Sequence, residues 1–498
     1  MIYFEKVSEV YIRVFAEPDV EQNLSDFFKF RVPGYQFTPQ YKARLWDGWI
    51  RLYDLHRKTL YAGLYNYLLE FCERNQYKIQ FIPNKDFGTF KSTTTKEKAE
   101  IEQFVNLLNP HTKGNHIQVR EYQLDAVTEA INQERILLLS PTASGKSLII
   151  YSLLRWHLER DRKSIIIVPT TSLVEQLYSD FEDYSSADSQ FNVNDYCQKL
   201  YSGFTREFSK SVLITTWQSI YKQPRAWFDQ FNVVFGDEAH QFKAKSLTSV
   251  MEKMQNIRYR IGTTGTLDGK QVHRLVLEGL FGAVHKVTTT KELMDSNHLA
   301  NLNIQCIVLK YSDEVRKARK NNTYQEEMDW LVMNDERNKF IRNLALATKG
   351  NSLVLFQYVE KHGKELYGQI VQKAKEGRKI FFVYGGTDTD QREEIRHITE
   401  AESDAIIVAS YGTFSTGINI PSLENIIFAS PTKSKIRNLQ SIGRGLRLKD
   451  GKDECKIYDI ADDLHWKSWK NHTLNHFLER VKIYSEEKFN YKVAEVNL

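Results

Sequence analysis

The sequence predicts an α/β protein with two lobes in series, each built on a parallel sheet, behind a small α+β domain. Three observations predict this class. From about residue 117, continuous apolar runs alternate with helical patterns, which is typical of parallel strands covered on both faces. After a charge-rich interval the alternation starts again, with runs such as SLVLFQ, DAIIVAS and NIIFASP. The first 85 residues instead alternate apolar and polar positions around two helix-like segments.

These changes of pattern divide the chain into domains. We expect a small α+β domain, a polar linker, a first lobe, a charge-rich connection that enters the second lobe, the second lobe itself, and an amphipathic helical tail. The corresponding residues are 1–85, 86–116, 117–290, 291–350, 351–465 and 466–498. The linker is predicted because NKDFGTFKSTTTKEKAE at 84–100 has no apolar face.

Composition predicts a globular protein. At 498 residues the chain is too long for one core, so several domains are expected. A net charge of +5 is too small to identify a binding partner by itself. The four cysteines lie far apart and are expected to be reduced and buried. Because no signal peptide is evident and no apolar run approaches the ~20 residues of a membrane span, we expect a soluble cytoplasmic protein without membrane contact.

The stretch LLLSPTASGKSLII at 137–150 predicts a phosphate-binding loop at a strand-to-helix turn. Backbone N–H groups and the helix dipole hold the anion in such loops, whose usual form is G-x-x-x-x-G-K-[ST]. Ser140 replaces the first glycine, and Ala143 stands where many of these loops have another. An alanine there requires a conformation that it can tolerate, so we expect a stiffer loop that still binds phosphate. The residues expected around the nucleotide are Thr142, Ala143, Ser144, Gly145, Lys146 and Ser147.

Two carboxylates at the end of another apolar strand indicate that the nucleotide is hydrolysed. The run NVVFGDEAH places Asp237 and Glu238 at that strand end. We expect Asp237 and Ser147 to ligate Mg²⁺, Glu238 to orient or deprotonate the attacking water, and Lys146 to reach the β- and γ-phosphates of ATP. An acidic pair after a strand is often only a solvated turn. Its conjunction with the phosphate loop is what predicts an ATPase.

The order of the motifs in this lobe resembles superfamily-two helicases. SPTASGKS, VPTTSLVEQ, TTWQS, DEAH and GTTGT follow one another as they do in that family. The resemblance implies that both lobes are RecA-like and that Gln123, in REYQLDAV, contacts adenine. It also implies that Thr264 and Thr266 couple the nucleotide site to the second lobe.

Three further residues of the first lobe are implied by the same resemblance to touch the backbone of a nucleic acid. They are Thr170, Thr216 and Gln218. For the two threonines, capping of a helix or a strand end remains the alternative.

The second lobe contains no phosphate loop but has two arginines at helical spacing. QSIGRGLR at 440–447 places Arg444 and Arg447 about one turn apart. Such a pair can reach the γ-phosphate and stabilise charge on the transferring phosphoryl group, with Gln440 part of the same motif. The resemblance further implies that Gly417, in STGINIP, helps to bridge ATP and nucleic acid. Asn419 replaces the aspartate usual in that motif, which leaves any salt bridge there in doubt.

The N-terminal domain combines basic and aromatic residues. Residues 29–58 contain seven Lys and Arg against two Asp, interleaved with Tyr, Phe and Trp. Cations neutralise phosphates and aromatic rings stack on bases, so this domain is expected to contact DNA, with Arg44 and Trp46 as candidates. Trp46 packed in a core is the alternative.

The branch of the family is indicated by the ending GRGLR and by WDG at 46–48. These features, and the order of domains, resemble XPB-like motors and phage recombination helicases over essentially the full chain. The resemblance implies an ATP-driven helicase that remodels Holliday junctions, stalled forks and R-loops, with recombination or single-strand-binding proteins as partners. The alternatives are the translocating subunit of a restriction or nuclease complex, a DNA-annealing protein without motor activity, and an RNA helicase.

Overall fold

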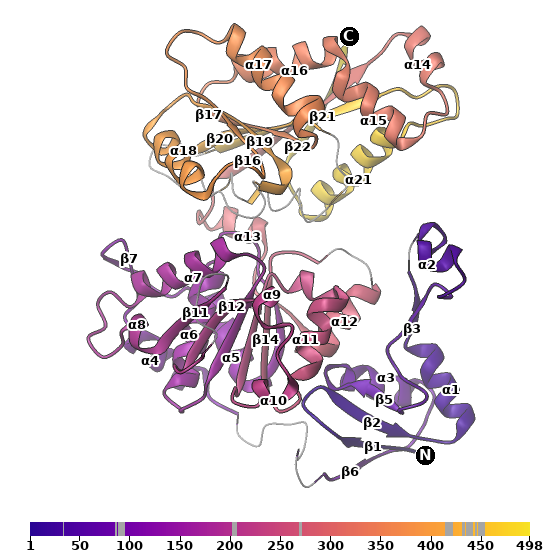
Figure 1. Ribbon diagram of the computed structural model, residues 1–498, viewed down its shortest axis with the longest axis vertical. Coiled ribbons are helices and arrows are strands. Elements are labelled where there is room, and N and C mark those ends of the chain that lie inside the picture. Colours follow the sequence, from indigo (N-terminus) through magenta and orange to yellow (C-terminus); the bar gives the residue numbers. More distant parts are fainter. Residues whose placement is uncertain are drawn as a thin grey trace. The chain divides into compact units, whose positions relative to one another are not determined.

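Figure 1 shows the computed structural model of the chain. The structure describes residues 1–32, 34–84, 87, 95–201, 207–267, 271–413, 422–430, 434, 442–443, 446 and 454–498. The chain forms two compact units, residues 1–140 with 145–287, and residues 141–144 with 288–498. Within the described ranges, no helix is long and apolar enough to cross a bilayer.

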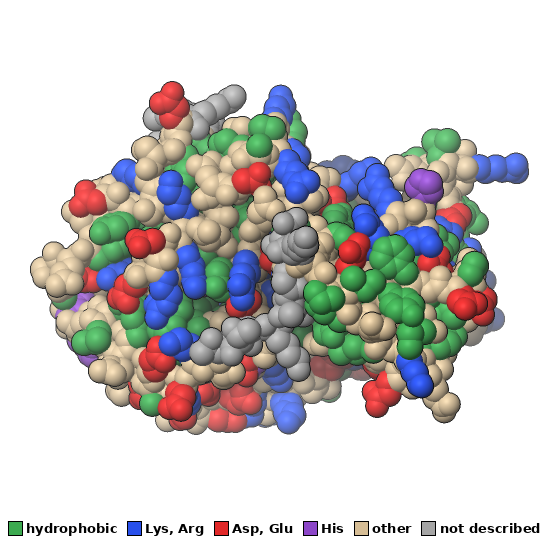
Figure 2. Space-filling view, turned by 90° about the horizontal axis from the view of Figure 1, so that it is seen from below, with side chains coloured by type: hydrophobic (Ala, Val, Ile, Leu, Met, Phe, Trp, Pro, Cys, Tyr) green, Lys and Arg blue, Asp and Glu red, His purple; other side chains and the backbone are tan. Residues whose placement is uncertain are grey.

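The N-terminal domain is a four-stranded sheet covered on one face by two helices. The strand order is β5-β2-β1-β6, with only the β1–β6 pair parallel. The strands are β1 (Ile2–Lys6), β2 (Tyr11–Phe15), β5 (Thr59–Tyr61) and β6 (Ile79–Ile82), and the helices are α1 (Pro18–Phe27) and α3 (Tyr65–Arg74). The other face carries Tyr3 and Ile82, each 37% exposed. Figure 2 shows hydrophobic side chains gathered in the right half of the view, over this domain.

A hairpin arm, residues 29–51, extends from this domain. Its strands β3 (Lys29–Arg31) and β4 (Trp49–Arg51) are antiparallel, and its outer part contains the 3₁₀ turn η1 (Tyr35–Phe37) and the short helix α2 (Pro39–Lys42). Figure 1 shows α2 at the end of the arm, well away from the sheet of its own domain.

The N-terminal domain and the first lobe share one continuous core. Leu60 and Leu64 pack in the same hydrophobic cluster as Leu275 and Phe281. Around this core, the Tyr61 hydroxyl donates to Glu252 at 2.6 Å and the Tyr67 hydroxyl donates to Glu278 at 2.7 Å. The N-terminal domain is therefore built into the first compact unit and is not a separate module on a tether.

The first lobe is a parallel seven-stranded sheet in the order β11-β12-β10-β13-β14-β9-β15. Its strands are β9 (Arg135–Leu139), β10 (Ser164–Val168), β11 (Cys197–Leu200), β12 (Val212–Thr216), β13 (Val233–Asp237), β14 (Tyr259–Thr264) and β15 (Val284–Lys286). The central strands β10, β12 and β13 are almost completely buried, as their continuous apolar sequences predict. Their carboxyl ends meet at one edge, where ligands bind in such sheets.

Helices cover both faces of this sheet. They are α4 (Lys98–Leu107), α5 (Glu121–Gln133), α6 (Lys146–Leu158), α7 (Thr171–Tyr184), α8 (Val193–Tyr196), α9 (Trp217–Ile220), α10 (Arg225–Phe228), α11 (Lys245–Lys253) and α12 (Gln271–Phe281), with a 3₁₀ segment η3 (Ala239–Lys243). The prediction that 86–116 is entirely linker is wrong. Ile101, Phe104 and Val105 of α4 belong to the core of the lobe, and residues 111–116 form the small β7–β8 pair (His111–Thr112, Asn115–His116).

The second lobe repeats the architecture, with a parallel seven-stranded sheet in the order β18-β19-β17-β20-β21-β16-β22. Its strands are β16 (Asn301–Lys310), β17 (Asn351–Phe356), β18 (Ile380–Val383), β19 (Ile406–Ser410), β20 (Leu423–Phe428), β21 (Glu454–Asp463) and β22 (Tyr491–Asn497). Two parallel sheets behind a small mixed domain confirm the predicted fold class.

The interval 291–350 contains β16, which lies between β21 and β22 inside the sheet. One predicted segment of the second lobe needs correction. The tail 466–498 is not only helical, since after α21 (His472–Glu486) the chain adds β22 parallel to β16. Both strands pair with partners far away in sequence, which local patterns do not reveal.

The remaining helices of this lobe are α13 (Thr290–Asp295), α14 (Asp313–Arg319), α15 (Tyr324–Met333), α16 (Asp335–Ala347), the π-helical η4 (Val359–Gly363), α17 (Lys364–Lys373) and α18 (Thr389–Ala401). Two buried ion pairs fasten helices to β21: Arg337 of α16 with Asp462, and Arg480 of α21 with Asp459. All four cysteines carry thiols and are buried, as the sequence predicts.

Candidate nucleotide-binding site

The predicted phosphate loop is a strand-to-helix turn between β9 and α6. Its N–H at Ser140 donates to the carbonyl of Thr264 at 2.8 Å, which ties the loop to the neighbouring strand β14. Within the turn, the Ser144 hydroxyl donates to the carbonyl of Pro141 at 2.7 Å. Gly145 then starts α6 with φ of +81°, a left-handed conformation that favours glycine. Thr142, Ala143 and Ser144 form the turn, and Lys146 and Ser147 form the first turn of the helix.

Ala143 departs from the conformation expected for alanine. Its φ is +66°, in the left-handed region, where the Cβ crowds the following carbonyl. The expectation that this residue adopts a backbone that alanine tolerates is therefore wrong. The loop keeps the fold that glycine usually allows, and it stores about 1–2 kcal/mol of local strain. Strain of this kind is characteristic of functional turns.

Gln123 lies against the loop, as its predicted role requires. The side chain is 4% exposed, and its Oε1 accepts from the N–H of Arg120 at 2.9 Å, which caps α5. Its amide nitrogen is so close to Gly145 that a Cβ at this glycine would overlap it. A side chain at this position would therefore be strained by its φ and would displace the Gln123 amide. The structure brings Gln123 and the loop together at one edge of the sheet.

The two predicted carboxylates lie at the end of β13, beside the loop. Nζ of Lys146 is 3.9 Å from Oε1 of Glu238. The Thr263 hydroxyl donates to Oδ1 of Asp237 at 2.8 Å and holds this carboxylate in place from the adjacent strand. Glu238 has a left-handed φ of +50°, which turns the chain sharply as it leaves the strand. The phosphate loop and the acidic pair therefore form one cluster.

The charges in this cluster act on one another. Burial raises the pKa of Asp237 above its ordinary value, the neighbouring Glu238 carboxylate raises it further, and the Lys146 ammonium opposes both effects. A carboxylate that is costly to ionise in the free protein gains from a cation placed beside it. The pKa shift indicates a site prepared for additional positive charge.

His240 connects the acidic pair to the GTTGT motif. Its Nδ1 lies 3.2 Å from Oε2 of Glu238 and 3.0 Å from Oγ1 of Thr264. The Thr264 hydroxyl itself donates to the carbonyl of Thr266 at 3.0 Å, so we assign the proton to Nδ1 of His240. A continuous line of polar contacts thus runs from Glu238 to Thr266. The sequence contained the signal for His240, because it is the last residue of DEAH.

Ser147 has a partner that the sequence does not reveal. Its hydroxyl is 2.8 Å from the hydroxyl of Tyr184, at the end of α7. If Ser147 donates this hydrogen bond, its lone pairs remain directed elsewhere, as a ligand oxygen requires. No motif marks Tyr184, since the two residues are 37 positions apart.

The predicted nucleic-acid contacts of the lobe divide into two groups. The Thr170 hydroxyl caps α7 by accepting from the N–H of Leu173, and the Thr216 hydroxyl is 3.0 Å from that of Ser219. Both hydroxyls therefore have the capping or local roles that were the alternative. Gln218 is exposed.

The second-lobe candidates Gly417, Gln440, Arg444 and Arg447 lie outside the described residues, as does Asn419.

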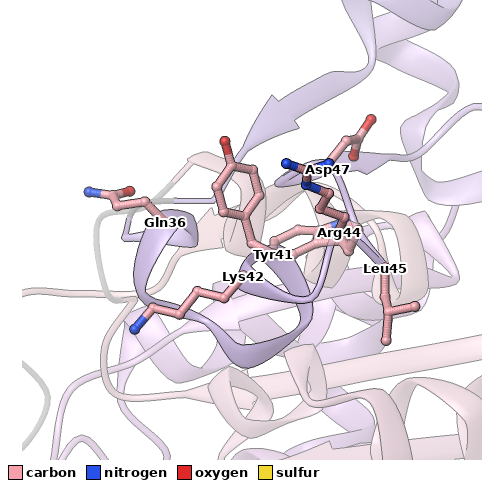
Figure 3. A pocket seen from close by; sticks show the side chains of 7 residues that line it. Gln36, Tyr41, Lys42, Arg44, Leu45 and Asp47 are labelled. Atoms are coloured by element: carbon pink, nitrogen blue, oxygen red, sulfur yellow. The ribbon is translucent and has the colours of Figure 1, made fainter.

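The N-terminal candidates Arg44 and Trp46 lie on the arm, far from the nucleotide cluster in sequence. Arg44 is exposed, whereas Trp46 is half-buried and its indole N–H donates to the carbonyl of Trp49 at 2.8 Å. Both line a hollow of about 580 Å³, together with Gln36, Tyr41, Lys42, Leu45 and Asp47. Figure 3 shows the side chain of Lys42 pointing outward from the short helix α2 and that of Leu45 pointing outward from the turn after it.

Comparisons with known proteins agree with these observations. Residues 1–82 match the family "DNA helicase UvsW, N-terminal", residues 116–269 match "Type III restriction enzyme, res subunit", and residues 336–449 match "Helicase conserved C-terminal domain". The ATP-dependent DNA helicase uvsW of Enterobacteria phage T4 is 34% identical over 515 aligned positions, which cover 100% of this chain and 99% of that protein.

Two further comparisons concern fold and motor type. The crystal structure of T4 UvsW matches with a TM-score of 0.52 at 32% identity, covering 100% of this chain and 99% of the other. The DNA 3'-5' translocase XPB2 of Sulfurisphaera tokodaii is 23% identical and covers 71% of this chain and 84% of that protein. The resemblance to phage recombination helicases that the sequence motifs predict is confirmed.

Proposed function

This chain belongs to the UvsW family of DNA helicases, and on that premise we propose that it hydrolyses ATP to move on DNA and remodel branched DNA. Holliday junctions, stalled forks and R-loops are the proposed substrates, in recombination, repair and replication. The observation that carries the proposal is the contact between the phosphate loop and the strand-end acids, where Lys146 approaches Glu238 to 3.9 Å beside Asp237.

In the proposed hydrolysis, each described residue has a separate task. Backbone N–H groups of residues 142–147 cradle the phosphates at the start of α6, and Lys146 pairs with their negative charge. Glu238 orients the attacking water, and His240 lies beside the Glu238 carboxylate, with its Nδ1 3.2 Å from Oε2. Gln123, fixed against Gly145, contacts the adenine.

The donor groups fit a magnesium ion. Asp237 offers a carboxylate held by Thr263, and Ser147 offers a hydroxyl oxygen, which are ligands that Mg²⁺ prefers. When bound, Mg²⁺ neutralises charge on the phosphates of ATP. Thr263 would keep the Asp237 oxygens in place, and the raised pKa of Asp237 supports the assignment, because a nearby cation favours the ionised carboxylate.

Coupling of hydrolysis to movement is proposed along the polar line from Glu238 through His240 and Thr264 to Thr266. A change in charge at Glu238 alters the hydrogen bonding of His240, and therefore of the GTTGT turn. Gln440, Arg444 and Arg447 keep the role that their motif suggests, stabilising charge on the transferring phosphoryl group, and Gly417 keeps its bridging role.

Contacts with DNA are proposed for both parts of the first compact unit. The segments at Thr170 and Thr216 would use backbone groups, since their hydroxyls already have partners, and the exposed Gln218 would use its side chain. The N-terminal domain, within 1–85, would recognise the branch through the arm that carries Arg44 and Trp46. Recombination and single-strand-binding proteins are proposed as partners.

The test compares ATPase and unwinding rates on single strands, duplex, forks, four-way junctions, R-loops and RNA duplex. We expect branched DNA to stimulate both rates, and Lys146→Ala to abolish DNA-stimulated hydrolysis. Lys245→Ala, an exposed lysine of the same lobe, is the matched control and should leave both rates unchanged. A preference for RNA duplex over every branched DNA would refute the substrate, and hydrolysis that survives Lys146→Ala would refute the mechanism.

A further inference from the structure

The outer part of the arm presents two bulky hydrophobic side chains to solvent. Phe37 is 73% exposed and Leu45 is 81% exposed. They flank α2, one from the turn before it and one from the turn after it. Single exposed hydrophobic residues are common on protein surfaces, but two on one short projection of a domain are not explained by the packing of that domain.

The arm holds these side chains outward on a stiff support. The guanidinium of Arg31 lies 4.1 Å from the ring centre of Tyr35, whose ring packs edge-on against Tyr41 with centres 4.6 Å apart. Gly48, with φ of +84°, brings the returning strand so close to Tyr35 that a Cβ there would overlap its ring. Trp46 is tied to the carbonyl of Trp49. The outer part of the arm, residues 35–47, is called the tip. It needs little reorganisation before it engages a partner.

Positive charge accompanies the exposed hydrophobic residues. Asp47, the acidic residue of the arm, is bound by Arg51 through two hydrogen bonds, which lowers the pKa of its carboxyl to about 2. Lys42 and Arg44 are exposed, and the described residues provide neither with an ion-pair partner. The positive charges of Lys42 and Arg44 are thus available to pair with an anionic group of a partner.

We propose that the tip is a wedge that separates DNA strands at a branch point, with Phe37 and Leu45 inserted between base pairs and Lys42 and Arg44 on the flanking phosphates. Proteins that unstack DNA insert residues of this kind, while cations hold the backbone. The hollow lined by Tyr41 and Trp46 offers an aromatic surface for a displaced base. This inference rests on the proposed function, because it names the part of the chain that opens the branch.

A wedge predicts that strand opening and binding to the branch depend on different side chains of the tip. Removing the hydrophobic side chains should impair strand opening and leave the motor intact, whereas removing the cations should weaken binding to the branch. A surface that binds another protein would show neither effect with purified components. Substitutions at side chains this exposed are not expected to disturb the fold.

The experiment uses the full chain with Phe37→Ala/Leu45→Ala and a four-way junction carrying 2-aminopurine at the crossover. Without ATP, the wild type should raise 2-aminopurine fluorescence and the double variant should not. With ATP, the double variant should lose about tenfold in the rate of strand separation, as expected when stacking contacts are removed, while its junction-stimulated ATPase stays within about twofold. The exchanged variant Phe37→Leu/Leu45→Phe should retain activity.

Two controls isolate the tip. Leu107→Ala removes a leucine that is 77% exposed on the first lobe and should change nothing. Lys42→Ala/Arg44→Ala should weaken junction binding and reduce its salt dependence, with Arg74→Ala, an exposed arginine of the same domain outside residues 29–58, as the matched charge control.

The outcomes separate this inference from the proposed function. Unchanged strand separation in Phe37→Ala/Leu45→Ala overturns the wedge and leaves the helicase assignment in place. An equal loss of ATPase, binding and opening in that variant also overturns it, because the tip would then only grip DNA. If the wild type neither binds nor opens any branched DNA, both proposals fail.

Discussion

Replacing Glu9 by glutamine should destabilise the N-terminal domain and the first lobe together. The Glu9 carboxylate, in the connection from β1 to β2, lies 2.7 Å from Nζ of Lys6 and 3.6 Å from a guanidinium nitrogen of Arg135 in β9. Burial lowers the pKa of both Lys6 and Arg135, and the charge of Glu9 opposes that shift in each. The substitution therefore leaves the buried Lys6 and the largely buried Arg135 without the carboxylate between them.

The expected loss in the free energy of unfolding follows from these contacts. Removing one partner of a buried ion pair costs about 3–5 kcal/mol. Two features reduce it here: glutamine keeps an oxygen that can accept from Lys6, and the Arg135 side chain is 16% exposed and also donates to the main-chain carbonyl of Glu9. We expect about 2 kcal/mol, which lowers the unfolding temperature of a unit of this size by roughly 5 °C.

Calorimetry of the full chain measures this shift. The transition of the first compact unit should move and that of the second should not. Glu70→Gln is the matched control, because its ion pair with Arg74 is exposed and should contribute less than ~0.5 kcal/mol. Equal shifts for the two variants would refute the reasoning, since the buried contact would then be worth no more than a surface one.

Three further substitutions probe the nucleotide site. The raised pKa of Asp237 means that, between its ordinary value near 3.8 and the raised value, the folded protein binds more protons than the unfolded chain; stability of the ATP-free protein should therefore fall as pH rises through that window. Asp237→Asn should remove this slope in pH-dependent unfolding, raise stability at neutral pH and abolish hydrolysis; a slope that persists in the variant contradicts the assignment. Ala143→Gly should relieve about 1–2 kcal/mol of strain and lose part of that to the flexibility of glycine, leaving a net gain of about 0.5 kcal/mol in chemical unfolding. A destabilised variant would show that the left-handed turn is not strained. Tyr184→Phe should raise the Mg²⁺ concentration for half-maximal binding of a fluorescent nucleotide about fivefold, because the Ser147 hydroxyl loses the acceptor that orients it. An unchanged Mg²⁺ dependence would show that Tyr184 does not position Ser147.

The sequence was most informative where structure is local. The apolar run of β13 followed at once by two acids, and the run of β9 followed by a loop and helix, locate the nucleotide site from local pattern alone. Parallel strands place their carboxyl ends at one edge, so a correct assignment of strands brings Lys146 and Glu238 together.

The sequence was less informative where contacts join distant segments. The contact of Ser147 with Tyr184 and the pairing of β22 with β16 have no local signature. Helix α4 is different, because Ile101, Phe104, Val105 and Leu108 follow the i, i+3, i+4, i+7 spacing of a buried helical face. That pattern is present in the sequence, but the linker was predicted from the polar stretch at 84–100 that precedes it.

The shared core has a consequence for the order in which this protein folds as it is synthesised. The first 82 residues leave the ribosome early, but Tyr61 and Tyr67 find their carboxylate partners only at positions 252 and 278. The face that meets helix α12 therefore stays uncovered on the nascent chain while roughly two hundred more residues are added, about ten seconds or more at bacterial rates. The nascent chain therefore exposes this apolar face before the two lobes of the motor are complete. A chaperone that shields the face would act during that interval.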